Sequence, residues 1–321
     1  MDKLITNNSN WPYSIDFQAY LGAPMDKRTL YETKVTRFLK LLFKIAVSVT
    51  CLWYVFNKID FKEVIIAIKN ANWIWLFTAF LIYTVSKIIG SYRLNIYFKN
   101  IKINLTSSQN IKLYWLGMFY NLFLPGAITG DAYKVLVLSK KFDVSIKKTT
   151  AAVLLDRFSG LLSLGLIVAF YSIFIIKEKW LIAIFIIGVL SAIPLLYFII
   201  KKIFPEFLPG FWSTFLLGAA VQLTILICAY FILFSLNIYD DQLIFVFIFF
   251  IAIVASVLPI SVGGGLGVRE FVMIEGAKYA GIEQHNALVL SLLFYLITLG
   301  CSLIGLIYVF KNPLKKDIEI N

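Results

Sequence analysis

Residues 255–271 read Ala-Ser-Val-Leu-Pro-Ile-Ser-Val-Gly-Gly-Gly-Leu-Gly-Val-Arg-Glu-Phe and interrupt a long apolar region. The interruption contains a proline, four glycines within five residues, and then an arginine and a glutamate. Residues 123–134, Phe-Leu-Pro-Gly-Ala-Ile-Thr-Gly-Asp-Ala-Tyr-Lys, follow the same order of Leu-Pro, small residues and a charge. Matching breaks in the two halves of a hydrophobic chain are typical of a binding site built from broken transmembrane helices.

The composition indicates a multi-pass membrane protein. Of the 321 residues, 60% are hydrophobic and 15% are charged, whereas soluble domains are nearer half apolar and a quarter charged. Several apolar runs reach the roughly 20 residues that a helix needs to cross a bilayer. The net charge of +12 is explained by Lys and Arg in cytoplasmic loops, which set the orientation of the chain. We therefore expect no nucleic-acid partner.

No residue pattern in the sequence indicates a metal, a cofactor or a catalytic centre. The three cysteines lie in separate apolar runs, and His285 is the single histidine. Neither a clustered ligand set nor an ATP-binding loop nor a nucleophile–histidine pair is present in the sequence. We expect no cofactor and no enzymatic activity.

The apolar runs and the basic loops divide the chain into three parts. Residues 1–37 form a polar N-terminal lead, residues 38–312 a single polytopic membrane domain, and residues 313–321 a cytoplasmic tail. The distribution of Lys and Arg places both termini in the cytoplasm and the domain in the cell membrane, inner or plasma. Residues 58–70 alternate lysines with apolar residues and predict a short helix on the membrane surface.

The membrane domain is predicted to be all-α, with about six transmembrane helices and two re-entrant hairpins. The apolar residues 111–124 reach roughly 21 Å as a helix, too short for about 30 Å of hydrocarbon. Three spans and one hairpin in each half, about 38–176 and 180–310, would give an inverted repeat whose hairpin tips meet near the bilayer midplane. Eight full transmembrane helices stay open as the alternative. The predicted spans are 38–56, 71–89, 149–176, 180–200, 211–236 and 285–310, with hairpins around 111–139 and 242–280.

The second break is a candidate anion site. Its glycines permit unusual backbone angles and close approach of a lipid headgroup. A helix beginning near Leu266 would point its positive N-terminal end at that site, and Arg269 would add a charge suited to phosphate. Arg269 and Glu270 point about 100° apart on a helix and are not expected to pair along one face. The alternative is that the glycines only allow a turn or close helix packing. The glycines are Gly263, Gly264, Gly265 and Gly267.

The first break carries Asp131, which caps the returning helix, provides an intramembrane partner for Arg269, or contacts a cationic lipid headgroup. Lys134 is expected to extend to the cytoplasmic surface. Asp156 and Arg157 either form a solvated pair at a protruding helix end or line the cavity. Arg93 is read as a cytoplasmic-interface residue. The helix breaks themselves are placed at Pro125, Gly126, Gly130 and Pro259.

Three motifs together carry a family resemblance. They are Leu-Pro-Gly-x-x-x-Gly-Asp-x-x-Lys at 124–134, Leu-Leu-Asp-Arg-Phe-Ser-Gly at 154–160 and Leu-Pro-Ile-Ser-Val-Gly-Gly-x-x-Gly-Val-Arg-Glu at 258–270. Over about residues 35–312 the chain resembles the lysylphosphatidylglycerol synthase transmembrane family, also called the flippase-like domain family. The resemblance implies an all-helical membrane domain and, in some members, movement of lysyl-phosphatidylglycerol between leaflets. It implies functional roles for Pro125, Gly130, Asp131, Asp156, Arg157, Pro259, Gly263, Gly264, Gly267, Arg269 and Glu270.

Two departures from the family pattern bear on activity. Bifunctional members carry a soluble aminoacyl-transferase domain after the membrane part, whereas this chain stops at Asn321, so we expect it not to synthesise the lipid. Thr129-Gly130 stands where the family commonly has Gly-Gly, and Lys134 often corresponds to Arg. These differences leave the lipid itself open.

The expected function is that of a lipid flippase or translocase. Its substrate would be an anionic or aminoacylated phospholipid, or a polyprenyl-phosphate-linked glycan lipid. The alternatives are a membrane glycosyltransferase, an accessory protein in cell-envelope polysaccharide or glycolipid synthesis, and a scaffold that binds partners through its basic loops. Membrane lipids are the expected partners, with enzymes of lipid or glycan synthesis as further ones.

Overall fold

The computed structural model of the chain describes residue 53 and residues 61–123, 128–257, 265 and 267–314. Several predictions fall outside this range and receive no structural account. They are the polar lead, most of the span 38–56, residues 315–321 of the tail, and the break residues Pro125, Gly126, Pro259, Gly263 and Gly264.

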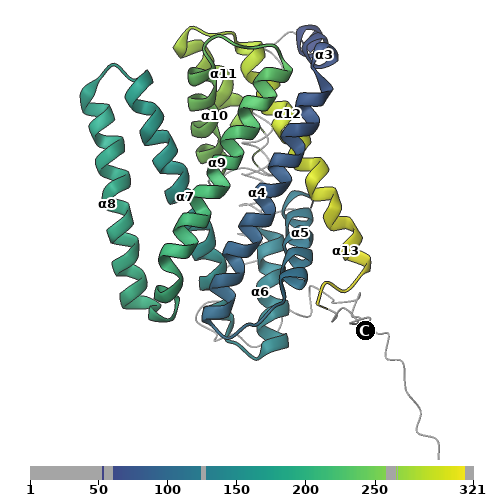
Figure 1. Cartoon of the computed structure of the whole chain (residues 1–321), viewed down its shortest axis with the longest axis vertical. Helices are drawn as coiled ribbons and strands as arrows, with labels where there is room; N and C mark the ends of the chain where they lie inside the picture. The colour runs from purple at the N-terminus through teal and green to yellow at the C-terminus, as the bar shows by residue number, and fades with distance from the viewer. Residues whose placement is uncertain (1–52, 54–60, 124–127, 258–264, 266, 315–321) are drawn as a thin grey trace, which may run out of the picture. The chain divides into compact units, whose positions relative to one another are not determined.

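The described regular structure is helical throughout (Figure 1). The elements are α3 (Phe61–Asn70), α4 (Trp73–Asn100), α5 (Ser107–Phe123), α6 (Thr129–Phe142), α7 (Ile146–Ile175), α8 (Lys179–Ile203), η1 (Pro205–Gly210), α9 (Phe211–Ser235), α10 (Gln242–Val257), α11 (Val268–Ala280), α12 (Gln284–Leu303), η2 (Ile304–Leu306) and α13 (Ile307–Phe310).

Five helical stretches in the described part are long and apolar enough to cross a membrane. They are α4, α7, α8, the continuous η1–α9, and the continuous α12–α13. The all-α membrane fold predicted from composition is therefore confirmed. Only Ile200 is buried among the 25 residues of α8. A helix that is apolar on every side and exposed to its surroundings is stable in hydrocarbon and not in water.

One predicted span boundary is wrong. The span predicted at 71–89 was ended by its basic residues, but α4 continues for 28 residues to Asn100. Arg93 consequently lies inside the helix instead of beyond it. Arg93 forms an ion pair within the protein, as described below, so it does not require water at a helix end.

Besides α3, four described helices are too short to cross a bilayer, and these four form two pairs. α5 packs on α6, and α10 packs on α11. The longest, α5, has 17 residues, or about 26 Å against about 30 Å of hydrocarbon. In Figure 1 the α5–α6 pair lies toward the lower end of the view, and the α10–α11 pair lies at the upper end. The two interrupted regions thus occupy opposite ends of the helix bundle.

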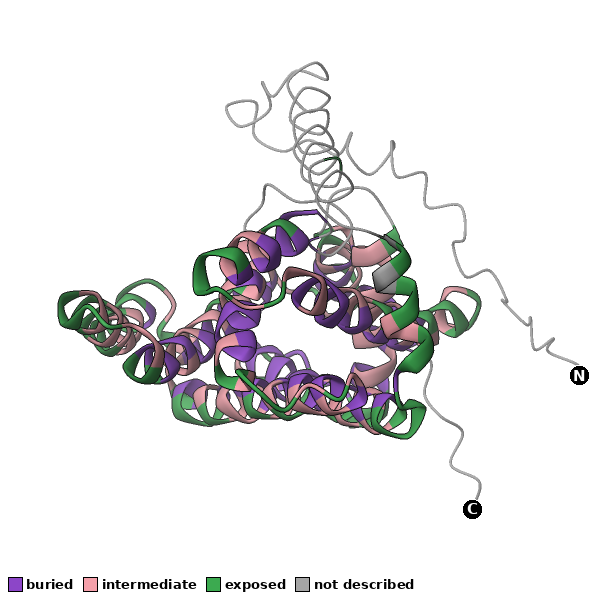
Figure 2. Ribbon diagram, turned by 90° about the horizontal axis from the view of Figure 1, so that it is seen from above, coloured by how far each residue is buried: buried purple, intermediate pink, exposed green. Residues whose placement is uncertain are grey.

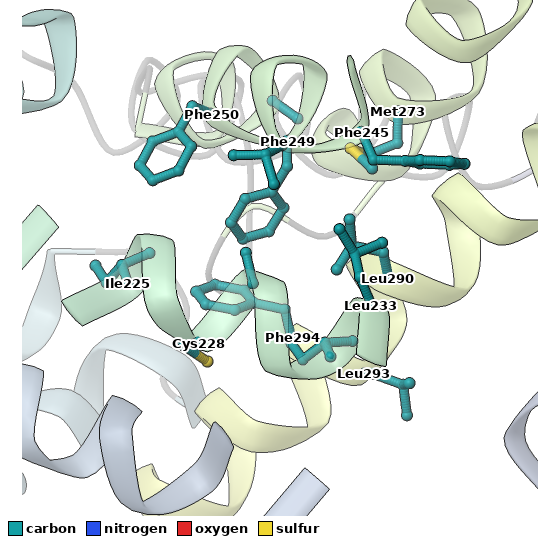
Figure 3. Close-up of a cluster of buried hydrophobic side chains, with 14 of the residues drawn as sticks. Ile225, Cys228, Leu233, Phe245, Phe249, Phe250, Met273, Leu290, Leu293 and Phe294 are labelled. Carbon is teal, nitrogen blue, oxygen red and sulfur yellow. The ribbon is translucent and has the colours of Figure 1, made fainter. Parts of the chain in front are cut away.

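A large apolar core holds the C-terminal helices together. Figure 3 shows Phe249 of α10 and Phe294 of α12 among its side chains, and their ring centroids are 4.9 Å apart. Cys228 of α9 is fully buried in the same cluster. Figure 2 shows buried residues on the faces that the helices turn toward one another. α4 packs along α9 more extensively than any other helix pair. This packing holds the two interrupted regions in place.

Candidate functional site: two charge clusters and the lysine between them

The first charge cluster forms around Asp131 in the first turn of α6. Lys134 Nζ donates to Asp131 Oδ1 at 3.0 Å, and Arg157 Nε from α7 donates to Oδ2 at 2.6 Å. Ile128 occupies the N-cap position of α6, so the capping role predicted for Asp131 is wrong. Lys134 is 4% exposed, which also excludes the predicted surface position for its ammonium group. The partners of Asp131 are Lys134 and Arg157, not Arg269.

Gly130 permits a close crossing of α5 and α6. A Cβ atom added to Gly130 would collide with the backbone carbonyl of Gly117. The Gly130 N–H donates to Asn121 Oδ1 at 2.8 Å, which joins the two helices near the break. Gly130 therefore has a packing role, and that packing places Asp131 beside α7.

A second ion pair, between Arg93 and Asp156, lies buried against α9. Arg93 Nε donates to Asp156 Oδ1 at 2.7 Å. The guanidinium lies against Gly160 and Gly218, where any side chain would crowd it. Its Nη1 is buried with no hydrogen-bond partner in the described part of the chain. The buried position of Arg93 therefore differs from the cytoplasmic interface predicted for it. Asp156 pairs with Arg93 and does not form the solvated pair predicted with Arg157.

The second charge cluster joins Arg269 and Glu270 to Ser291 of α12. Arg269 Nη2 donates to Glu270 Oε1 at 2.8 Å, and Arg269 Nε donates to Ser291 Oγ at 2.7 Å. Ser291 Oγ donates in turn to Glu270 Oε1 at 2.8 Å. The expectation that these neighbours would not pair is wrong. Their side chains converge because Ser291 provides a shared partner from a neighbouring helix.

The beginning of α11 differs from the anion site predicted there. Glu270 Oε2 accepts a hydrogen bond from the Gly267 N–H at 2.7 Å, so a carboxylate of the chain already occupies the positive end of the helix. Gly265 and Gly267 have φ angles of +95° and +86°, which a glycine adopts without strain. Gly265 and Gly267 thus lie in a turn, and the described part of this cluster is electrically neutral.

Lys87 is a candidate site residue that the sequence analysis missed. It lies midway along α4, and its Nζ is 4.3 Å from the centroid of the Tyr83 ring. It has no acidic partner in the described part of the chain. A charge in the middle of a spanning helix is costly and usually functional. Its position inside an otherwise uninterrupted apolar run of the sequence could have identified it as a candidate.

Aromatic rings connect Lys87 with both clusters. On one side, the Tyr83 ring packs edge-on against Phe294 at 5.4 Å, and Phe294 lies 5.6 Å from the Arg269 guanidinium. On the other side, Lys134 Nζ lies 4.8 Å from the centroid of Tyr114. Tyr114 contacts α4 at Gly90, one helical turn after Lys87, where a Cβ atom would approach its hydroxyl to 2.8 Å.

The charge balance differs between the two clusters. Around the first break, three cations (Arg93, Lys134 and Arg157) face two carboxylates, Asp131 and Asp156, and Lys87 adds a further positive charge. Around the second break, one cation faces one carboxylate. The described residues contain no group of three or more side chains that could hold a metal ion. The arrangement can attract and hold an anion on the side of the first cluster.

Comparison with known proteins agrees with the motifs. A family model described as the lysylphosphatidylglycerol synthase TM region matches residues 41–305, which confirms the resemblance predicted over about 35–312. The UPF0104 membrane protein PH1989 of Pyrococcus horikoshii is 26% identical over 337 aligned positions. That alignment covers 86% of this chain and 97% of the archaeal protein.

Proposed function

The chain belongs to the lysylphosphatidylglycerol synthase transmembrane family, and on that basis we propose that it moves an anionic lipid between the leaflets of the cell membrane. The candidate substrates are an anionic or aminoacylated phospholipid and a polyprenyl-phosphate-linked glycan lipid. All three classes carry a phosphate that must cross the hydrocarbon region. The proposed activity requires no covalent step.

One observation carries the proposal: a lysine that has no carboxylate partner among the described residues lies between two charge clusters, halfway along a spanning helix. Lys87 is the 15th of the 28 residues of α4, which places it about 21 Å from the first residue. Because an isolated charge in hydrocarbon is costly, the positive site would be occupied by a counter-ion or by water. A lipid phosphate supplies such a counter-ion.

The two short helix pairs complete the proposed pathway. We infer that α5–α6 and α10–α11 are re-entrant hairpins that enter the membrane from opposite sides, as inverted-repeat transporters build their midplane sites. The loop between α6 and α7 is flanked by Lys140 and Lys141 in the last turn of α6 and by Lys147 and Lys148 in the first turn of α7. By the positive-inside rule this loop is cytoplasmic, and both chain termini are then cytoplasmic.

The headgroup would pass from the first cluster to Lys87 and then onward past the second cluster. Arg157 is the accessible cation of the first cluster, with 36% of its side chain exposed. It is therefore the proposed first contact for phosphate. Lys134 is held by Asp131 and is available only if that ion pair opens. Arg269 and Glu270, which neutralise each other, would stabilise the second hairpin instead of holding phosphate.

Reconstitution of the purified full chain in liposomes tests the proposal. Fluorescent phosphatidylglycerol, a polyprenyl-phosphate sugar analogue and phosphatidylcholine are tested separately, and a membrane-impermeant quencher reports the fraction that changes leaflet. We expect an anionic lipid to move faster than in protein-free vesicles and Arg157→Gln to slow it. The matched control, Lys179→Gln at the exposed start of α8, leaves the rate unchanged. Folded protein that accelerates none of the lipids contradicts the proposal, and sugar transfer to lipid would favour the glycosyltransferase alternative.

A further inference from the structure

We propose that the groove between α7 and α8 binds an acyl chain of an anionic phospholipid, with the lipid phosphate at Lys147. The groove has a volume of about 780 Å³ and lies apart from both charge clusters. Its walls are the apolar faces of two helices, and the lining residues recur along each helix at helical spacing. Representative lining residues are Leu154, Phe158 and Leu161 on α7, and Val189, Ala192 and Leu196 on α8.

The groove exists because α7 and α8 diverge. They are joined by a short turn at residues 176–178 and remain close as far as Gly165, where an added Cβ atom would lie 3.2 Å from Val189. Beyond this contact the helices separate toward Lys147 and Phe204, as Figure 1 shows for the α7–α8 pair. Gly165 thus closes one end of the groove, and Lys147 lies at the other.

Hydrocarbon is the occupant that the lining favours. Both walls belong to helices that can cross a membrane, and α8 is apolar on every side. Water in such a groove would find few polar partners, because Lys147 and Thr150 are the polar residues among those that line it. From Lys147 to Gly165 the groove follows α7 for about 27 Å. This length suits an extended acyl chain lying along the helix.

The charge at the open end specifies the headgroup. Lys147 is exposed, and no acidic side chain in the described part of the chain pairs with it. Its neighbour Lys148, in contrast, pairs with Glu206 at 3.4 Å. An ammonium at the end of an apolar groove complements a phosphate attached to an acyl chain. The inference needs only that the chain lies in a membrane, so it stands or fails separately from lipid translocation.

Photocrosslinking tests the site. The full chain is reconstituted in bilayers with phosphatidylglycerol that carries a diazirine on one acyl chain, and the labelled peptides are identified by mass spectrometry. We expect labels on the groove faces of α7 and α8. Ala192→Trp fills the groove and should abolish them, whereas Leu190→Trp, on an exposed part of α8 outside the lining, should preserve them.

The headgroup requires a second comparison. Lys147→Gln should reduce groove labelling by phosphatidylglycerol about fivefold, the size expected for one lysine near an anionic lipid. Labelling by the matching phosphatidylcholine probe should stay unchanged, and Lys177→Gln serves as the control. Uniform labelling of α8 that ignores Ala192→Trp would overturn the proposal. Crosslinks from the groove to a second copy of the chain would also overturn it, since a protein interface would then fill the groove.

Discussion

At the scale of single residues, buried charges are placed by partners that are distant in sequence. Arg93 and Asp156 are 63 positions apart, yet they form a direct hydrogen-bonded ion pair. Local sequence predicted that Arg93 lay at the cytoplasmic interface, and it left open whether Asp156 was solvated at a helix end or lined the cavity. Their mutual neutralisation and the space left by Gly160 and Gly218 allow them to remain inside the protein. Such a pairing depends on how α4, α7 and α9 pack, which no local pattern reveals.

Removing one member of this ion pair should destabilise the protein strongly. Arg93→Met leaves Asp156 buried without its cation, and losses of about 3 kcal/mol are typical of such a change. Arg93→Met combined with Asp156→Leu should recover most of the loss, because two apolar side chains replace both charges. Denaturant titration of the purified protein in detergent measures the free energy of unfolding. Equal stability of Arg93→Met and wild type would contradict the structural role of the pair.

A second residue-scale prediction concerns the crossing at Gly130. Gly130→Ala introduces a Cβ atom into the Gly117 carbonyl and should cost about 1–3 kcal/mol, as overpacking typically does. Gly188→Ala is the matched control, since no atom lies within 4 Å of the Cβ position there. Thermal unfolding should show a lower midpoint for the first variant alone. A similar midpoint for both would mean that α5 and α6 do not cross at this glycine.

At the scale of elements, hydropathy predicted the helices better than their ends or contacts. The span predicted at 149–176 is observed as Ile146–Ile175, and the one at 211–236 as Phe211–Ser235. The predicted and observed bounds agree because the hydropathy of the sequence changes strongly at each of these helix ends. The end of α4 was predicted too early because Arg93 and Lys99 resemble the basic residues that follow the end of a membrane span. The Arg269–Glu270 pairing was missed because the 100° spacing of neighbours on a helix describes α11 alone. In the structure, Ser291 on α12 forms hydrogen bonds with both side chains and so brings them together.

The turn before α11 yields an element-scale prediction. Gly267→Ala forces a side chain into a φ of +86° and should cost about 1–3 kcal/mol through backbone strain. It should also slow lipid movement, because the Gly267 N–H holds Glu270 in place. Gly281→Ala, with a left-handed φ of +73° and no atoms near its Cβ position, introduces a milder backbone strain away from the clusters. We expect Gly281→Ala to retain the wild-type translocation rate, and equal slowing by both variants would show that general destabilisation explains the effect.

At the scale of the whole molecule, the proposed orientation places α7 and α9 in defined directions across the membrane. Lys148 lies near the start of α7, and Tyr239 follows the end of α9. Both are exposed. In a background with the three native cysteines replaced, Lys148→Cys should react with an impermeant thiol reagent only from the cytoplasmic side. Tyr239→Cys should react only from the outside. Labelling of both cysteines from one side would contradict the orientation and the inverted repeat.

The account as a whole depends on Lys87, since the proposed pathway places the lipid phosphate beside its ammonium near the bilayer midplane. The most direct measurement is the translocation rate of fluorescent phosphatidylglycerol in liposomes containing wild type, Lys87→Arg or Lys87→Met, each at equal amounts of folded protein. The account predicts that Lys87→Arg retains most of the rate, because it keeps the positive charge, and that Lys87→Met falls to the protein-free rate. Wild-type movement of phosphatidylglycerol by Lys87→Met would contradict the account, since the headgroup would then cross without the charge proposed to hold it.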